Sequence, residues 1–261
     1  MTRSSRRQLS KSSAAYIAVG LILMTIMTII GLSAFLRVTE VRISGNSHYS
    51  YDSIVEASGI TRGDGLMFMN TDRISQNIRR ELPYISDANV TRSLPNAVNI
   101  EIFESTPVAT IYFAGDLLLI DQTGRILDIY TGVSDSILEL NGTKMIQIRG
   151  VEIESAVAGN QPRVSGLIAE TAFQHMQDIL IAMVNEGITD DVNFLDVSNI
   201  VNINFGYMNM YRVILGGIRD LRHKLGILPS TIARVHAEYP GTPVVISMTD
   251  PSGNVNFWPE P

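Results

Sequence analysis

No cysteine occurs among the 261 residues of this sequence, and several other chemical features are equally absent. Without cysteine the chain can form no disulfide, no thiolate nucleophile and no cysteine-ligated metal site. The sequence also has no G-x-S-x-G nucleophile elbow, no phosphate-binding loop and no G-x-G-x-x-G dinucleotide fingerprint. These absences favour a binding module over an enzyme, and we predict no catalytic residue, no cofactor and no small-molecule substrate.

Histidine is nearly as scarce. None of the four histidines stands at the spacing of a metal-binding pair; they are His48, His175, His223 and His236. The acidic pair Asp190-Asp191 lies where a helix is expected to give way to a strand, and it is most simply a solvated turn. We therefore predict no metal site.

Charge is missing from the segment Ala14–Leu36, which runs for 23 residues without an acidic or basic side chain. A helix of that length spans roughly 34 Å, enough to cross a hydrocarbon core of about 30 Å. No acidic residue precedes Glu40, and the tail before the segment carries four basic ones, Arg3, Arg6, Arg7 and Lys11. Because basic flanks stay in the cytoplasm, we predict a cytoplasmic tail at 1–13, one transmembrane helix at 14–36 and an exported remainder.

Two other interpretations of this segment remain. A cleaved signal peptide also begins with basic residues, and small residues at Gly31–Ala34 would suit a cleavage site, but its apolar core usually runs for about 7–15 residues. A buried helix of a soluble protein would normally show a polar stripe. A retained anchor fits the segment better than either.

The rest of the chain has the opposite imbalance of charge. Of 20 basic residues four lie in the tail, which leaves 16 basic against 26 acidic residues beyond it. An acidic exported region is a poor partner for nucleic acid or for an anionic surface. Its length is ample for one or two domains with apolar cores.

The first part of this region shows a β-α-α-β-β order over residues 37–108. Val38–Ser44 alternates as a strand does, and helices are expected at Tyr51–Ala57 and from Thr71 or Asp72 to Leu82. Two further strands follow at Ile85–Leu94 and Val98–Phe103.

The second part, residues 109–261, mixes strands with two or three helices. Strands are expected at the following segments: Val108–Phe113, Leu117–Ile120, Arg125–Ile129, Met145–Ile148, Val192–Val197, Ile200–Phe205, Tyr211–Leu215 and Pro243–Met248. An amphipathic helix is predicted at Ser165–Glu186, and another carries Ile218 to Leu228 until Pro229-Ser230 interrupts it, with a further turn or two expected at Thr231–Glu238. The fold class predicted for the exported region is α+β, with helices packed on a sheet rich in antiparallel pairs.

Several strings in the first part resemble one known family. They read V-x-x-V-R-I-S-G-N from Val38, G-I-T-R-G-D-G-L-M-F-M-N from Gly59 and A-N-V-T-R-S-L-P-N-A-V-N-I-E-I-F-E from Ala88. Together they are similar to the POTRA domain of the bacterial division proteins FtsQ and DivIB. The string L-L-I-D-Q-T-G-R-I-L from Leu118 and the end V-V-I-S-M-T-D-P-S-G-N-V-N-F-W-P from Val244 resemble the first hairpin and the terminal strand of that family's β-domain.

The resemblance implies a POTRA domain at 37–108 and a β-domain at 109–261, in a single-pass protein of the bacterial cell membrane at the division septum. It implies a non-enzymatic divisome scaffold that links septum assembly to septal peptidoglycan synthesis. The implied partners are single-span coiled-coil proteins like FtsB (or DivIC) and FtsL, together with the septal synthase complex.

The resemblance also implies that the last strand is an exposed edge to which a partner adds a strand. The candidate partner-binding residues are Val244, Val245, Ile246, Ser247, Met248 and Val255, with Phe257 and Trp258 as aromatic anchors.

Two rival functions remain open. A POTRA-bearing component of a protein export or outer-membrane assembly system would need tandem POTRA units or a run of barrel strands. An exported peptidoglycan enzyme would need a catalytic site that the sequence does not display.

Overall fold

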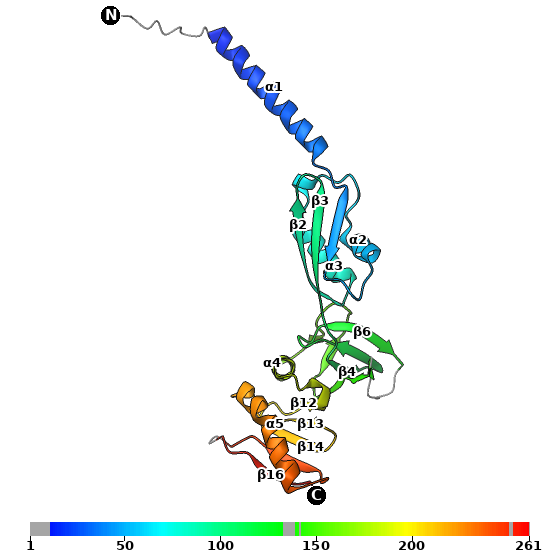
Figure 1. Ribbon diagram of the computed structural model, residues 1–261, viewed down its shortest axis with the longest axis vertical. Coiled ribbons are helices and arrows are strands. Elements are labelled where there is room, and N and C mark those ends of the chain that lie inside the picture. Colours follow the sequence, from blue (N-terminus) through cyan, green and yellow to red (C-terminus); the bar gives the residue numbers. More distant parts are fainter. Residues whose placement is uncertain (1–10, 133–138, 141, 251–252, 261) are drawn as a thin grey trace, which may run out of the picture. The chain divides into compact units, whose positions relative to one another are not determined.

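The computed structural model describes residues 11–132, 139–140, 142–250 and 253–260. These residues form two compact units (Figure 1). Unit 1 takes the described residues up to Ile78 together with Asp87–Phe103. Unit 2 takes Arg79–Ser86 and the described residues from Glu104 onward. The predicted α+β class is confirmed, because helices and strands occur together in the described residues.

The first helix, α1 (Lys11–Phe35), contains nearly all of the uncharged segment. Its apolar side chains that the structure describes are exposed, for example Tyr16 at 79% and Met27 at 72%. Within the described residues, however, no helix satisfies both the length and the hydropathy required for a membrane span, so the transmembrane helix stays a prediction. Of the basic tail predicted at residues 1–13, residues 1–10 lie outside the described part of the chain.

After α1 the chain forms the predicted β-α-α-β-β order. The elements are β1 (Glu40–Ser44), α2 (Tyr51–Ser58), the short 3-10 turn η1 (Leu66–Phe68), α3 (Thr71–Glu81), β2 (Ile85–Ser93) and β3 (Ala97–Glu104). The three strands form a sheet in the order β1-β3-β2, with β1 parallel to β3 from Glu40↔Ala97 to Ser44↔Glu101. In Figure 1 this sheet stands beside α2 and α3.

Local sequence explains these boundaries. Ser50 caps α2 because its hydroxyl accepts from the Ser53 amide at 3.2 Å, and Gly59 ends the helix at a φ of 67°. The apolar faces of the helices supply Ile54 and Ile78, both fully buried, to the core of this unit.

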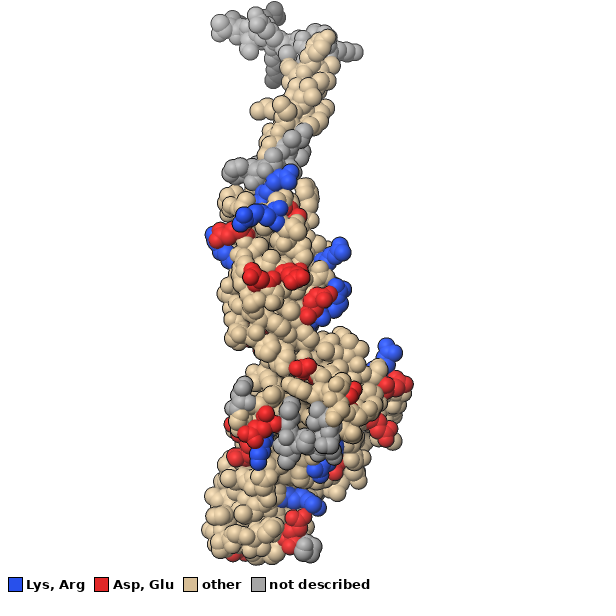
Figure 2. All heavy atoms as spheres, turned by 90° about the vertical axis from the view of Figure 1, so that its right-hand side faces the viewer, with Lys and Arg blue, Asp and Glu red and all other residues tan. Residues whose placement is uncertain are grey.

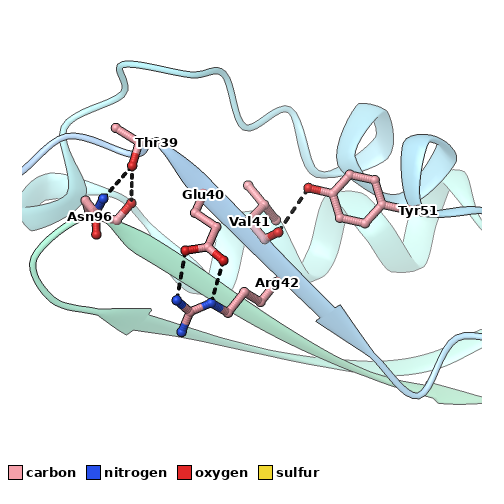
Figure 3. A network of polar contacts seen from close by, with 6 residues as sticks. All are labelled: Thr39, Glu40, Val41, Arg42, Tyr51 and Asn96. Atoms are coloured by element: carbon pink, nitrogen blue, oxygen red, sulfur yellow. Dashed lines mark hydrogen bonds and ion pairs between the residues drawn. The ribbon is translucent and has the colours of Figure 1, made fainter.

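The start of β1 is held by a network of polar contacts (Figure 3). Glu40 and Arg42 are two residues apart, so they share a face of the strand and pair at 2.8 Å. The hydrogen bond from Arg42 lowers the pKa of the Glu40 carboxyl. Thr39 and Asn96 bond to each other, and the Tyr51 hydroxyl donates to the carbonyl of Val41 at 3.0 Å.

Unit 2 contains a mixed sheet in which nine strands of the described residues take part, in the order β16-β15-β14-β13-β12-β9-β4-β5-β6. Their bounds are β4 (Ala109–Phe113), β5 (Asp116–Ile120), β6 (Ile126–Thr131), β9 (Ile146–Arg149), β12 (Val192–Asp196), β13 (Ile203–Tyr207), β14 (Tyr211–Gly216), β15 (Val244–Ser247) and β16 (Asn256–Pro259). The pairs β4–β9, β9–β12 and β14–β15 are parallel and the others antiparallel. Two small ribbons, β7 (Glu139–Leu140) with β8 (Thr143–Lys144) and β10 (Ile153–Ser155) with β11 (Arg163–Val164), stand outside it.

Two long helices, α4 (Leu167–Glu186) and α5 (Leu221–Glu238), pack on this sheet, and a short 3-10 turn, η2 (Thr189–Asp191), precedes β12. Their buried side chains join those of the sheet in one core: Met176, Ile179, Leu180 and Met183 from α4, and Leu225, Leu228, Ile232 and Val235 from α5. The predicted amphipathic helix at 165–186 is confirmed.

The predicted break at Pro229 is wrong, because α5 continues through it to Glu238. A proline inside a helix removes one backbone hydrogen bond and usually kinks or ends the helix. Here Leu225, Leu228 and Ile232 on both sides of it are buried, so packing of the apolar face holds the helix together.

Candidate partner-binding surface

The candidate residues lie at one end of the nine-stranded sheet. Strand β14 leads into α5, which carries the chain back to β15, parallel to β14 from Tyr211↔Val244 to Ile214↔Ser247. The chain then turns and β16 runs antiparallel to β15, from Val244↔Pro259 to Ser247↔Asn256. Strand β15 therefore has a neighbour on each side.

This arrangement corrects the predicted edge. Because both sides of Val244–Ser247 are paired, this strand offers no free backbone for an added strand, and the free edge at this end of the described sheet is β16. Val244 and Ile246 are fully buried and Met248 is 4% exposed, all three within the core under the helices. Partner binding itself stays a prediction, but its backbone component moves from β15 to β16.

The other two candidates of β15 face the opposite side of the sheet. Val245 and Ser247 are 7% and 9% exposed. The hydroxyls of Ser247 and Thr249 lie 2.9 Å apart and bond to each other. Neither side chain is available to a partner without movement of its neighbours.

The aromatic residues of β16 divide between the two faces. Phe257 stands opposite Ile246 and packs against the core, with its ring edge-to-face with Tyr239 at 6.1 Å and the Arg234 guanidinium 5.1 Å over it. Trp258 stands opposite Val245 on the other face and is 44% exposed. Val255, just before the strand, is half-buried against the core. Of the candidates, Trp258 is the large side chain that the structure leaves open to a partner.

The direction of the backbone groups along β16 follows from one hydrogen bond. The amide of Glu260 donates to the carbonyl of Pro243 at 2.9 Å, so its backbone faces β15. Backbone groups of successive strand residues point to opposite sides, and those of Trp258 and Asn256 therefore also face β15. The amide of Phe257 and the carbonyls of Phe257 and Pro259 point to the free edge.

An ion pair flanks the tryptophan. Arg212 on β14 lies 3.2 Å from Glu260, with side chains 53% and 31% exposed. Since Arg212 is opposite Val245 and Val245 is opposite Trp258, the three side chains form a row across the sheet. An exposed pair of this kind contributes about 0–1 kcal/mol to stability. Its main effect is therefore to place one positive and one negative group beside Trp258.

Two titratable groups near this end of the sheet are shifted. Burial raises the pKa of Tyr207 to about 12, helped by its hydrogen bond to Asp191 at 3.1 Å. Burial lowers the pKa of Lys224, although Asp220 nearby opposes the shift. The Lys224 ammonium donates to the carbonyls of Leu215 and Gly217 at 2.7 and 3.2 Å, which fixes the start of α5 to the end of β14. Both groups are held by structural partners, the carboxylate of Asp191 for Tyr207 and two backbone carbonyls for Lys224.

Elsewhere in unit 2 a cavity of about 930 Å³ opens beside Asp121. The Asp121 carboxylate accepts from the Ser105 hydroxyl at 2.7 Å, from the Thr123 hydroxyl at 2.7 Å and from the Arg125 amide at 3.1 Å. These bonds hold a turn between β5 and β6. Among the described residues no group of three His, Cys, Asp or Glu side chains could hold a metal ion.

Sequence reasoning missed β16 as a strand, and with it the contacts of Phe257 to α5. A signal for it was present. The turn residues that end in Gly253 are followed by an alternation in which Val255 and Phe257 are apolar, and Pro259 is typical of an edge strand. Of the expected turn at 250–253, residues 251–252 lie outside the described part of the chain.

Comparison with known proteins agrees with the resemblance seen in the sequence. Residues 36–105 match the family model of the POTRA domain of FtsQ type. The chain is 25% identical over 191 residues to a cell division protein DivIB of Clostridium acetobutylicum, which covers 73% of this chain and 71% of that protein. It is 24% identical over 254 residues to the DivIB of Clostridium botulinum, covering 93% of each. It is 34% identical over 94 residues to a cell division protein FtsQ of Anaeromyxobacter, covering 36% of this chain and 31% of that protein.

Proposed function

From its kinship with the DivIB and FtsQ cell division proteins, whose FtsQ-type POTRA domain it carries, we propose that this chain is a non-enzymatic scaffold of the divisome. The scaffold links assembly of the division septum to septal peptidoglycan synthesis. The observation that carries the proposal is the pairing of this kinship with a free sheet edge at β16, next to an exposed tryptophan.

The proposed partners are single-span coiled-coil division proteins like FtsB (or DivIC) and FtsL, and through them the septal synthase complex. Their mode of binding is strand addition to β16. A partner strand laid beside β16 would bond to the amide and carbonyl of Phe257, which point to the free edge. Pro259 has no amide to offer, so it limits the length of the added pairing.

Side-chain recognition falls to Trp258 and its neighbours. A tryptophan that is 44% exposed presents a large apolar surface with one hydrogen-bond donor, a combination enriched at binding hot spots. The ion pair of Arg212 with Glu260 lies in the same row and offers charges of both signs at the rim of the contact. Phe257 lies on the core-facing side of β16, where its packing on Tyr239 and Arg234 holds the strand in place.

The proposal includes a membrane anchor at α1. Its support is the uncharged run Ala14–Leu36, the basic tail before it and the exposure of the described apolar side chains of α1. Apolar side chains without protein cover are stabilised by lipid. The N-terminus is then cytoplasmic, unit 2 and the part of unit 1 that follows α1 are extracytoplasmic, and the protein acts at the division septum of the cell membrane.

Depletion of the protein in its own bacterium tests the scaffold role. Depleted cells should grow into filaments with blocked septa, and a plasmid copy should restore division. If depleted cells divide normally, the divisome role is wrong. A copy with Trp258→Lys should fail to restore division, whereas Val201→Lys, at a side chain 73% exposed on a different part of unit 2, should restore it. Full rescue by Trp258→Lys would move the partner contact away from β16.

A further inference from the structure

The end of the POTRA domain that adjoins α1 exposes three large apolar side chains. Met67 is 51% exposed and Phe68 86%, both in the turn η1, and Leu94 in the loop between β2 and β3 is 64% exposed. Leu66 in the same turn is fully buried and fixes η1 to the core, so its two neighbours project outward. Single exposed apolar residues are ordinary on a protein surface, but three on loops at one end call for an explanation. We refer to Met67, Phe68 and Leu94 as the apolar tip.

Backbone hydrogen bonds tie one loop of the apolar tip to the residues that directly follow α1. The Leu66 amide donates to the carbonyl of Leu36 at 3.0 Å, and the Val38 amide donates to that of Asp64 at 2.9 Å. Arg37 and Gly65 form an antiparallel bridge between these two bonds. Helix α1 ends at Phe35, so η1 begins beside the first residue after the helix.

The loop that carries Leu94 is tied to the same place. The Thr39 amide donates to the carbonyl of Asn96 at 2.9 Å, and the Asn96 side-chain amide donates to the Thr39 hydroxyl (Figure 3). The Arg92 guanidinium donates to the carbonyl of Met69 at 2.5 Å, which joins this loop to η1. Both parts of the apolar tip are therefore held close to residues 36–39.

These connections limit how far the apolar tip can lie from the end of α1. Phe68 is two residues beyond Leu66, so its Cα lies at most about 8 Å from that of Leu66. The headgroup zone on each side of a bilayer is roughly 5–8 Å thick. With α1 as the anchor, Phe68 is therefore close enough to the end of the span to reach the headgroups.

The charges around the apolar tip also suit a membrane surface. Arg37, Arg62 and Arg92 are exposed at this end, and Figure 2 shows blue Lys and Arg atoms, with red Asp and Glu atoms beside them, where the chain leaves α1. Two acidic side chains oppose these charges: Glu40, which pairs with Arg42 at 2.8 Å, and Asp64. Hydrogen bonds from the amide and hydroxyl of Thr61 lower the pKa of Asp64, so it stays ionised at neutral pH. Each arginine near an anionic lipid surface contributes about 1 kcal/mol of attraction, which favours this end locally although the exported region as a whole is acidic.

We propose that the apolar tip inserts into the headgroup layer of the bilayer that holds α1, so that the POTRA domain rests on the extracytoplasmic face of that same membrane. The apolar side chains provide the contact, and the arginines pair with lipid phosphates at its rim. This inference rests on the proposed anchor. It adds a second, peripheral contact that holds the POTRA domain against the membrane rather than leaving it free on a tether.

The test uses the full chain in lipid vesicles. Trp258 is the sole tryptophan, so a Trp258→Phe background leaves room for one reporter. Phe68→Trp places it in the apolar tip. Phe103→Trp is the matched control, since Phe103 is 48% exposed near the other end of β3. Tryptophan fluorescence is recorded in vesicles with and without brominated acyl chains, first with zwitterionic lipid and then with added anionic lipid.

We expect bromine to quench the reporter at position 68 at least about twofold more than that at 103, and anionic lipid to widen the difference. Equal quenching at the two positions would overturn the inference. A reporter at 68 that emits at short wavelength without lipid quenching would also overturn it, because protein, either a partner or a second copy, would then cover the tip. Flotation of the same vesicles tests the anchor separately, since a chain that does not float with lipid refutes the anchor and not the tip alone.

Discussion

The free edge of β16 can be tested by two substitutions at a single residue. Phe257→Ala removes the ring but keeps the backbone amide, whereas Phe257→Pro removes both. The ring packs half-buried against Tyr239 and Arg234, so we expect either change to lower the free energy of unfolding by about 2 kcal/mol. Because the Phe257 amide points away from β15, its removal should add little to that loss.

Affinity for the partner should separate the two variants. One backbone hydrogen bond contributes about 1 kcal/mol net, so the proline variant should bind a single-span partner roughly fivefold more weakly than the alanine variant. Stability is measured by urea unfolding of the full chain in detergent, and affinity by titration calorimetry in the same detergent. Trp258→Pro is the reverse control, because its amide faces β15 and its loss should destabilise the unit by about 3 kcal/mol.

Two results would refute this reasoning. If Phe257→Pro and Phe257→Ala bind the partner equally, no strand adds at this edge. If the proline variant is less stable than the alanine variant by more than about 2 kcal/mol, the amide is used within the fold and the edge has been assigned to the wrong side of β16.

Three further outcomes follow from the structure. Ile246→Lys should lower the free energy of unfolding of unit 2, measured in urea, by more than about 4 kcal/mol, since the side chain is fully buried. A loss of partner binding by this variant would therefore say nothing about an interface. Gly150→Ala should lower the melting temperature far more than Gly115→Ala: both have positive φ, but only at Gly150 would the new Cβ meet the backbone, 2.2 Å from the Ser198 nitrogen. The raised pKa of Tyr207 contributes stability that is present below pH 10 and lost as pH rises toward about 12, so Tyr207→Phe should flatten that fall in alkaline urea unfolding.

The β-α-α-β-β segment was predictable because its elements carry local signals of their own. Ile74 and Ile78 recur at helical spacing, and Val98, Ile100 and Ile102 alternate as a strand does. Each of these side chains is buried in the structure. Sequence alone predicts a helix or strand correctly where the spacing of its apolar residues coincides with the side chains that the fold buries.

The order of the nine strands was not predictable. Strand β9 pairs in parallel with both β4 and β12, across long stretches of chain, and the region Tyr130–Val164 around it has little periodicity. Parallel pairing depends on which crossover packs best, and no local residue pattern specifies that. The continuation of α5 through Pro229 was missed for the same reason, since tertiary burial overrode a local rule.

The position of β15 could have been inferred from its composition. The run Val244–Ile246 is apolar on both faces, a pattern typical of a strand covered on both sides and paired in parallel. An edge strand usually alternates or carries a proline or a charge, as β16 does with Pro259. The resemblance to a family named β15 as the edge strand, and residue chemistry distinguishes it from β16, which is the edge in the structure.

The backbone of β16 is too short to bind a partner by itself. Its free edge offers one amide and two carbonyls, worth together about 3 kcal/mol net, whereas association loses at least about 4 kcal/mol of translational and rotational freedom. A short edge ended by Pro259 therefore resists pairing with another copy of itself. A specific partner must supply the remainder through side chains, and Trp258 is the exposed aromatic residue of β16. We therefore expect Trp258→Ala to weaken partner binding more than the loss of the Phe257 amide does, by calorimetry on the full chain, and a smaller effect would place the main contact outside this strand.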